Sequence, residues 1–106
     1  EWREKCRRVE AIGYDTLHVA DHFPRGLGPF AALATAAAIT ERIRVGPFVL
    51  ANDFRHPAML AKEAATLDLL SDGRLEVGIG AGWLRSEYEA TGIPFDRAGV
   101  RIDRLA

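Results

Sequence analysis

Three short segments rich in aliphatic and β-branched residues constrain the fold of this chain more than any other feature. They begin near Tyr14, Ile43 and Leu75, about 30 residues apart, which is the length of one strand–helix–strand unit. Stretches with helical character lie before, between and after them, at residues 2–12, 30–40, 56–71, 84–91 and 100–106. This alternation predicts an α/β fold with parallel strands, either a doubly wound sheet or an arc of a barrel.

The pattern of residues within the strands favours the barrel. In residues 75–80, apolar side chains alternate with positions that are polar or glycine, and residues 43–46 alternate in the same way. A doubly wound sheet is apolar on both faces. We therefore expect an arc of a TIM-type (β/α)8 barrel with about three parallel strands. Arg44 and Glu76, each second in its strand, are expected to form an ion pair on the interior face.

The second strand, residues 43–50, contains Pro47. Proline cannot donate a hydrogen bond to a neighbouring strand, so we expect this strand to be bulged or irregular at that point. The third strand is expected over residues 75–79.

Composition excludes several classes of function. The 106 residues carry a net charge of −1, which gives no basic surface for nucleic acid. No apolar run approaches the roughly 20 residues that a membrane span needs. A single cysteine, Cys6, allows neither an intrachain disulfide nor a cysteine-based zinc site, and no other metal cluster stands out. We expect one cytoplasmic domain over residues 1–106, truncated at both ends, with no nucleic-acid or membrane partner.

Asp21 and His22 follow the first strand, at the edge where α/β folds bind ligands. A histidine titrates near neutral pH, so His22 is a candidate for moving a proton or hydrogen-bonding a ligand. The alternative is a loop histidine that only packs or caps. His18, inside the strand, is expected to be a satisfied interior histidine.

A second loop at this edge, residues 52–57, precedes a helix that begins at Pro57. His56 or Asp53 is expected to cap this helix. Arg55 is either a partner for a ligand anion or a solvated surface residue. Farther along, Glu87 and Tyr88 are expected on a solvated helix face.

The third strand ends in a glycine turn, residues 78–82, followed by Trp83. Glycines let a ligand or another backbone approach closely, and the indole is either a flat wall for an aromatic ligand or packing between loops. Gly-x-Gly-x-Gly also occurs in nucleotide-binding turns. Residues 75–82 resemble the first motif of S-adenosylmethionine-dependent methyltransferases, although two strand–helix units precede them here. A methyltransferase is therefore kept as an alternative.

The order and spacing of these motifs resemble the bacterial-luciferase-like family, specifically its coenzyme F420-dependent branch. The likeness covers nearly the whole chain. It rests on Ala20-Asp21-His22-Phe23, residues 42–46 with 49–50, residues 54–57 with 63–68, and residues 71–74 through Gly82-Trp83 with Ser86-Glu87-Tyr88.

This resemblance implies a barrel of about eight strands, of which the chain supplies strands 2–4, with the F420 ring (alternatively FMN) lying across its mouth. It also implies a non-proline cis peptide bond between Phe48 and Val49, and room beneath the ring at the glycine turn. The residues implied at the cofactor are Asp21, His22, Phe48, Val49, Ala51, Gly80, Gly82 and Trp83.

The implied reaction is hydride transfer between C5 of the cofactor and a small organic substrate, with His22 orienting or protonating the reacting groups. A two-component FMN monooxygenase that uses a partner reductase and oxygen is the nearest alternative. Trp83 stands where sugar-phosphate dehydrogenases of this branch have an acid, which argues against a sugar-phosphate substrate. We expect a homodimer at full length and an inactive protein if the chain is isolated.

Overall fold

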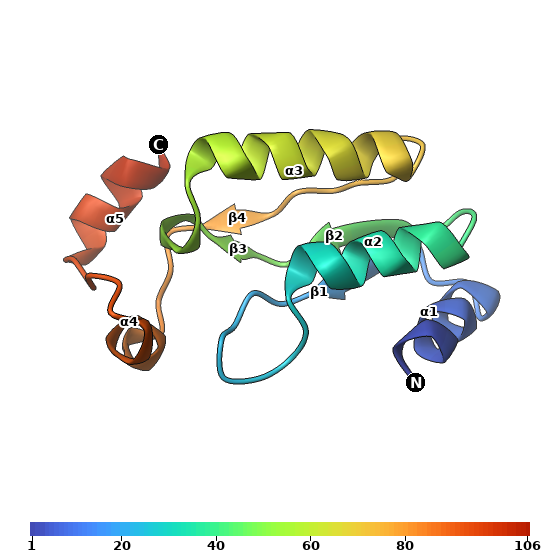
Figure 1. Cartoon of the computed structure of the whole chain (residues 1–106), viewed down its shortest axis with the longest axis horizontal. Coiled ribbons are helices and arrows are strands. Elements are labelled where there is room, and N and C mark those ends of the chain that lie inside the picture. Colours follow the sequence, from blue (N-terminus) through green and yellow to red (C-terminus); the bar gives the residue numbers. More distant parts are fainter.

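Helices and short strands alternate along the whole chain in the computed structural model, which describes residues 1–106 (Figure 1). No helix combines the length and apolar character needed to cross a bilayer. The elements in order are α1 (Trp2–Ala11), β1 (Thr16–Val19), α2 (Pro29–Ile39), β2 (Arg44–Pro47), β3 (Leu50–Ala51), the 3-10 turn η1 (Asn52–Phe54), α3 (Pro57–Leu70), β4 (Ile79–Gly80), α4 (Arg85–Thr91) and α5 (Ala98–Leu105).

The strands form two parallel pairs, β1 with β2 and β3 with β4. A single parallel bridge between Val45 and Leu75 joins β2 to the segment that leads into β4. Neighbouring segments thus follow chain order, which is consistent with the predicted arc of a barrel. The irregularity predicted at Pro47 is confirmed, because β2 ends there and the Phe48–Val49 peptide bond before β3 is cis.

The prediction of a continuous third strand over residues 75–79 is wrong. Residues 76–78 lie opposite the break between β2 and β3, so no regular ladder forms beside them. Isolated bonds remain, from the Glu76 N–H to the Val45 carbonyl at 2.9 Å and from the Leu50 N–H to the Gly78 carbonyl at 2.8 Å. Only Ile79 and Gly80 form the strand β4.

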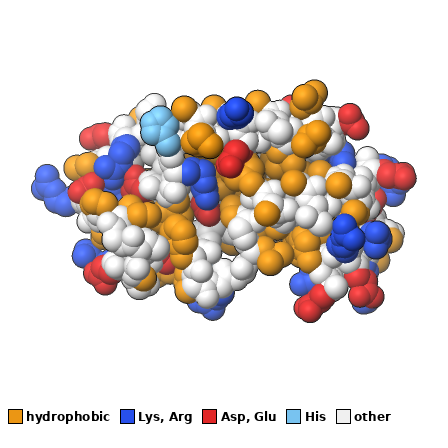
Figure 2. All heavy atoms as spheres, viewed as in Figure 1, with side chains coloured by type: hydrophobic (Ala, Val, Ile, Leu, Met, Phe, Trp, Pro, Cys, Tyr) orange, Lys and Arg blue, Asp and Glu red, His pale blue; other side chains and the backbone are white.

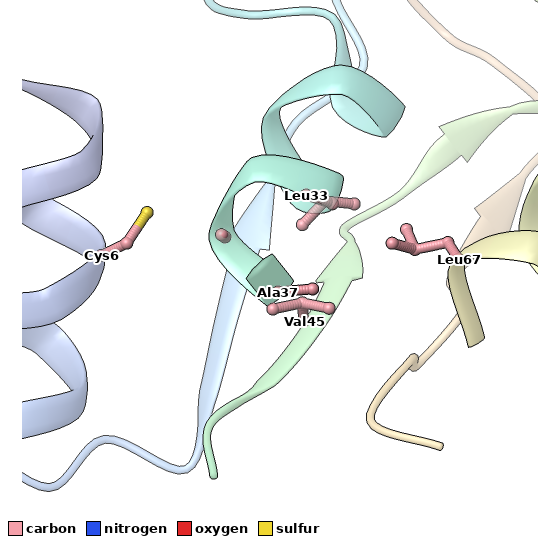
Figure 3. Packing of buried hydrophobic residues seen from close by; sticks show 6 residues of the cluster. Cys6, Leu33, Ala37, Val45 and Leu67 are labelled. Atoms are coloured by element: carbon pink, nitrogen blue, oxygen red, sulfur yellow. The ribbon is translucent and has the colours of Figure 1, made fainter. Parts of the chain in front are cut away.

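The hydrophobic core lies between the strands and the helices. Its side chains come from α1, α2, β2 and α3 and converge around α2, as Figure 3 shows: Cys6, Leu33, Ala36, Ala37, Val45 and Leu67. The alanines of α2 keep that helix thin, so it can approach β2 closely. Leu17 and Val19 of β1 pack against the same cluster, as their alternation predicts.

The opposite strand face is uncovered in this chain. The molecule measures 43 × 25 × 18 Å, and its smallest extent matches about two layers of secondary structure. Phe48 is 68% exposed. Figure 2 shows hydrophobic side chains at the surface among charged ones that gather toward the ends of the molecule. His18 is exposed and lies 5.2 Å from the Phe48 ring, so the prediction of a satisfied interior histidine is wrong for this chain.

The predicted interior ion pair is confirmed. The Nε of Arg44 lies 2.5 Å from Oε1 of Glu76, and the Thr16 hydroxyl donates to Oε2 of Glu76 at 3.4 Å. Both charged side chains are about half exposed here, which limits the pair to about 1 kcal/mol or less of stabilisation.

Arg74 ties the helices together at the amino-terminal ends of the strands. Its guanidinium donates to the carbonyl of Ala37 at 2.7 Å, of Ile43 at 2.9 Å and of Ser71 at 2.7 Å. It also donates to the hydroxyl of Thr40 at 3.0 Å. Carbonyls from the end of α2, the start of β2 and the end of α3 are satisfied by one side chain, which fixes how these three segments meet.

Glu10, near the end of α1, binds three consecutive backbone N–H groups. Its carboxylate accepts from Glu41 at 3.1 Å, Arg42 at 2.7 Å and Ile43 at 2.8 Å. Partial burial raises the pKa of Glu10, but these three donors and the charge of Arg42 outweigh it and hold the pKa below the ordinary 4.5. The deprotonated carboxylate thus anchors α1 to the start of β2.

We expect this anchor to make stability depend on pH. A folded-state pKa below the unfolded value stabilises the protein fully above about pH 4.5, and this stabilisation is lost as the pH falls through the folded pKa. In denaturant titrations of the full-length protein, E10Q should therefore be less stable than wild type at neutral pH, and the gap should shrink on acidification. E4Q, on the same helix, is the control. A gap that does not change with pH would contradict the anchor.

Candidate functional site

A hollow of about 370 Å³ opens at the carboxyl ends of the strands. The structure brings together there all eight residues that the family resemblance implies at a cofactor: Asp21, His22, Phe48, Val49, Ala51, Gly80, Gly82 and Trp83. Four further residues complete the lining: Leu50, Phe54, Ala81 and Glu87. The site thus combines the end of β1, the segment from β2 into β3, and the turn after β4.

One wall of the hollow is apolar and the facing turn lacks side chains. Phe48 and Val49 present exposed side chains, and Gly80 lies against Val49. A Cβ atom at position 80 would stand 3.0 Å from Cγ2 of Val49, closer than ordinary contact. At Gly82, φ is +81°, and a Cβ atom would overlap the Tyr88 hydroxyl. The glycines therefore let the turn pack directly against Val49 and Tyr88, and at positions 80 and 82 they contribute only backbone to the lining of the hollow.

Trp83 stands at the edge of the hollow and is 72% exposed. Its ring meets the imidazole of His22 edge-on, with the two centroids 6.3 Å apart and the planes at 88°. The indole is thus not packed between loops in this chain and is free to contact a ligand next to His22.

His22 is held by Glu87 from α4. Its Nδ1 lies 2.9 Å from Oε1 and 3.0 Å from Oε2 of Glu87, and the backbone N–H of Phe23 donates to Oε1 at 2.9 Å. Glu87 is only 4% exposed, so its prediction as a solvated helix residue is wrong. Sequence reasoning missed this partner, although the aromatic Tyr88 beside it could have indicated that this part of α4 is buried.

Asp21 forms a buried ion pair with Arg55. The guanidinium contacts both carboxylate oxygens, Nη1 to Oδ2 at 2.7 Å and Nη2 to Oδ1 at 2.9 Å. The backbone N–H of Ala51 donates to Oδ2 at 2.9 Å. The alternative of a solvated surface residue is therefore wrong, because the Arg55 side chain is only 20% exposed, and the role of partner for a ligand anion stays a prediction. Asp21 lines the hollow while its charge is already neutralised.

Tyr88 fixes α4 beneath the glycine turn. Its side chain is fully buried, contrary to the predicted solvated face, and its hydroxyl donates to Oδ2 of Asp53 at 3.1 Å. Burial raises the pKa of Tyr88, and the Asp53 carboxylate raises it further. Asp53 also pairs with Arg104 and does not cap α3. The cap is His56, whose Nδ1 accepts from the Ala58 N–H at 3.1 Å, as predicted.

Comparison with known proteins places this chain in one protein family. A family model of luciferase-like monooxygenases matches residues 1–103. The chain is 38% identical over 98 residues to a 4-hydroxyprotoasukamycin monooxygenase of Streptomyces nodosus subsp. asukaensis, covering 87% of this chain and 26% of that protein. It is 35% identical over 110 residues to an F420-dependent glucose-6-phosphate dehydrogenase of Amycolatopsis mediterranei, covering 96% and 33%.

A solved structure gives the same fold. An F420-dependent secondary alcohol dehydrogenase in complex with an F420–acetone adduct superposes with a TM-score of 0.86 at 28% identity. The match covers 96% of this chain and 33% of that one. The chain thus spans about a quarter to a third of the length of the proteins it resembles.

Proposed function

Because the chain belongs to the luciferase-like monooxygenase family, we propose that it is the cofactor-binding part of an oxidoreductase that transfers a hydride between coenzyme F420 and a small organic substrate. Its three strand segments would be strands 2–4 of a TIM-type barrel, with the hollow at the barrel mouth. An F420-dependent dehydrogenase at 35% identity over 96% of the chain supports this cofactor.

The observation that carries the proposal is the shape and lining of the hollow. Phe48 and Val49 line it with apolar side chains, the glycine turn that packs against Val49 adds only backbone at positions 80 and 82, and His22 and Trp83 line it as well. A flat tricyclic ring suits a hollow that combines apolar lining with a few polar groups. Bound there, F420 would supply the redox chemistry, giving or taking the hydride at its C5 position.

The chain's own residues then have separate tasks. Val49 and Phe48 bind one face of the ring and exclude water from it. His22 binds or transfers a proton at the edge of the ring, within reach of the substrate. Trp83 contributes an apolar wall, which favours an uncharged substrate over a sugar phosphate. Asp21 and Arg55 keep the end of β1 in place.

An FMN-dependent monooxygenase with the same fold is the second candidate. It is favoured by the 38% identity of this chain to the 4-hydroxyprotoasukamycin monooxygenase. The hollow would suit either ring, because F420 and FMN share a tricyclic ring system and the lining residues would contact only that part.

Separate titrations of the full-length protein with F420, FMN and S-adenosylmethionine, followed by absorbance and fluorescence, test this assignment. We expect saturable binding of F420, and loss of binding in G80V, because the new side chain would collide with Val49. G99A is the control, since a Cβ at position 99 meets nothing within 4 Å. Preferential binding of FMN would support the monooxygenase. Binding of S-adenosylmethionine alone, or of none of the three, would overturn the proposal.

A further inference from the structure

Glu87 is a buried acid in the hollow that the roles above leave unused. Its side chain is 3% exposed, and both oxygens are within hydrogen-bond distance of Nδ1 of His22. A carboxylate can only accept hydrogen bonds, so Nδ1 must carry the proton that joins them. The neutral ring therefore has its proton on Nδ1 and its lone pair on Nε2.

The backbone N–H of Phe23 helps to hold the Glu87 carboxylate in place. It donates to Oε1 of Glu87 at 2.9 Å and so holds the carboxylate against the segment that carries His22. Two contacts from one carboxylate reach adjacent residues, His22 and Phe23, and leave the imidazole little freedom to rotate. Because Nδ1 is occupied, Nε2 is the ring nitrogen left to a ligand.

We propose that Glu87 is a positioning residue that keeps the proton of His22 on Nδ1 and presents Nε2 to the substrate side of the hollow. Its effect on turnover rests on the proposed function, whereas its effect on the tautomer does not. In a dry site a carboxylate also stabilises the imidazolium that forms when Nε2 takes a proton. Acid and histidine thus act as one unit, with only the histidine in contact with the reacting groups.

The direct test is 15N NMR of the histidine rings in the full-length protein, with the His22 signals assigned through the H22N variant. We expect Nδ1 to be protonated in the wild type. E87A removes the acceptor, so the proton should move to Nε2, which an unconstrained neutral imidazole prefers. E87Q retains an acceptor oxygen of the same size and should keep the proton on Nδ1. A wild-type proton on Nε2 alone, or an unchanged tautomer in E87A, would overturn the proposal.

Kinetics give a second readout. E87A should lower kcat by about 10- to 100-fold with little change in KM, as is typical when the partner that orients a functional histidine is removed. E87Q should recover part of that loss. E89Q is the matched control on the same helix, where the Glu89 side chain is exposed and 3.9 Å from Arg85. A fall in E89Q equal to that in E87A, or a rise in KM alone, would contradict positioning.

These outcomes separate the two proposals. If the wild-type protein binds neither F420 nor FMN, the proposed function is wrong. The tautomer of the His22 ring then still tests whether Glu87 keeps the proton on Nδ1. If E87A does not fold, the wild-type and E87Q spectra decide it.

Discussion

Replacing His22 with alanine in the full-length protein is expected to lower turnover by about 100-fold or more, the range for loss of a group that transfers a proton in the transition state. The ring stands at the edge of the hollow, with Nδ1 bound by Glu87 and the Trp83 ring edge-on to it. Alanine removes the proton-carrying ring and leaves the apolar lining by Phe48 and Val49 intact. Cofactor affinity should therefore change much less than kcat.

Stopped-flow measurement of the reductive or oxidative half-reaction isolates the chemical step. H56A is the control histidine variant, because His56 caps α3 outside the hollow and its loss should cost about 1 kcal/mol of stability without affecting the rate. Unchanged turnover in H22A would show that His22 takes no part in the chemical step.

The second large effect is on stability. D21A should destabilise the protein by about 3–5 kcal/mol, because it leaves Arg55 as a buried charge without its partner. The two side chains are 7% and 20% exposed, and the guanidinium contacts both carboxylate oxygens. Ala51 would also lose the acceptor for its N–H. Urea denaturation of the full-length protein measures the loss.

An exposed pair provides the matched comparison. Glu41 and Arg42 lie 3.9 Å apart with most of their surface in solvent, so E41A should cost under about 1 kcal/mol. The double variant D21L/R55M removes both buried charges and should recover much of the stability lost in D21A. A loss below about 1 kcal/mol in D21A would show that the pair is not buried in the full-length protein.

The elements that local sequence patterns describe were predicted well. The first two strands, the interruption at Pro47 and the helix start at Pro57 all depend on residues close in the chain, and each is confirmed, whereas the third strand is reduced to Ile79 and Gly80. The Arg44–Glu76 pair was also predictable, because both residues occupy the second position of neighbouring predicted strands, and a parallel bridge between Val45 and Leu75 keeps these segments in register. Register then predicts their contact without knowledge of any loop.

The partners within the site were not predictable in this way. His22 and Glu87 are 65 residues apart, and Asp21 and Arg55 are 34 apart. Their contacts depend on how α4 and the loop after β3 fold back over the strand ends, which no periodicity reports. The eight cofactor residues were named largely from family resemblance, and the structure gathers them in one hollow.

The hydrogen bonds of Arg74 have a consequence for how this fold can change. They join α2, β2 and α3 at the pole opposite the hollow, so the scaffold is secured far from where chemistry is proposed. Loops at the other pole can then be exchanged between relatives, or randomised in a library, without loosening that clamp. Directed evolution toward new substrates should begin with Trp83 and Phe54, which line the hollow, and leave Arg74 untouched.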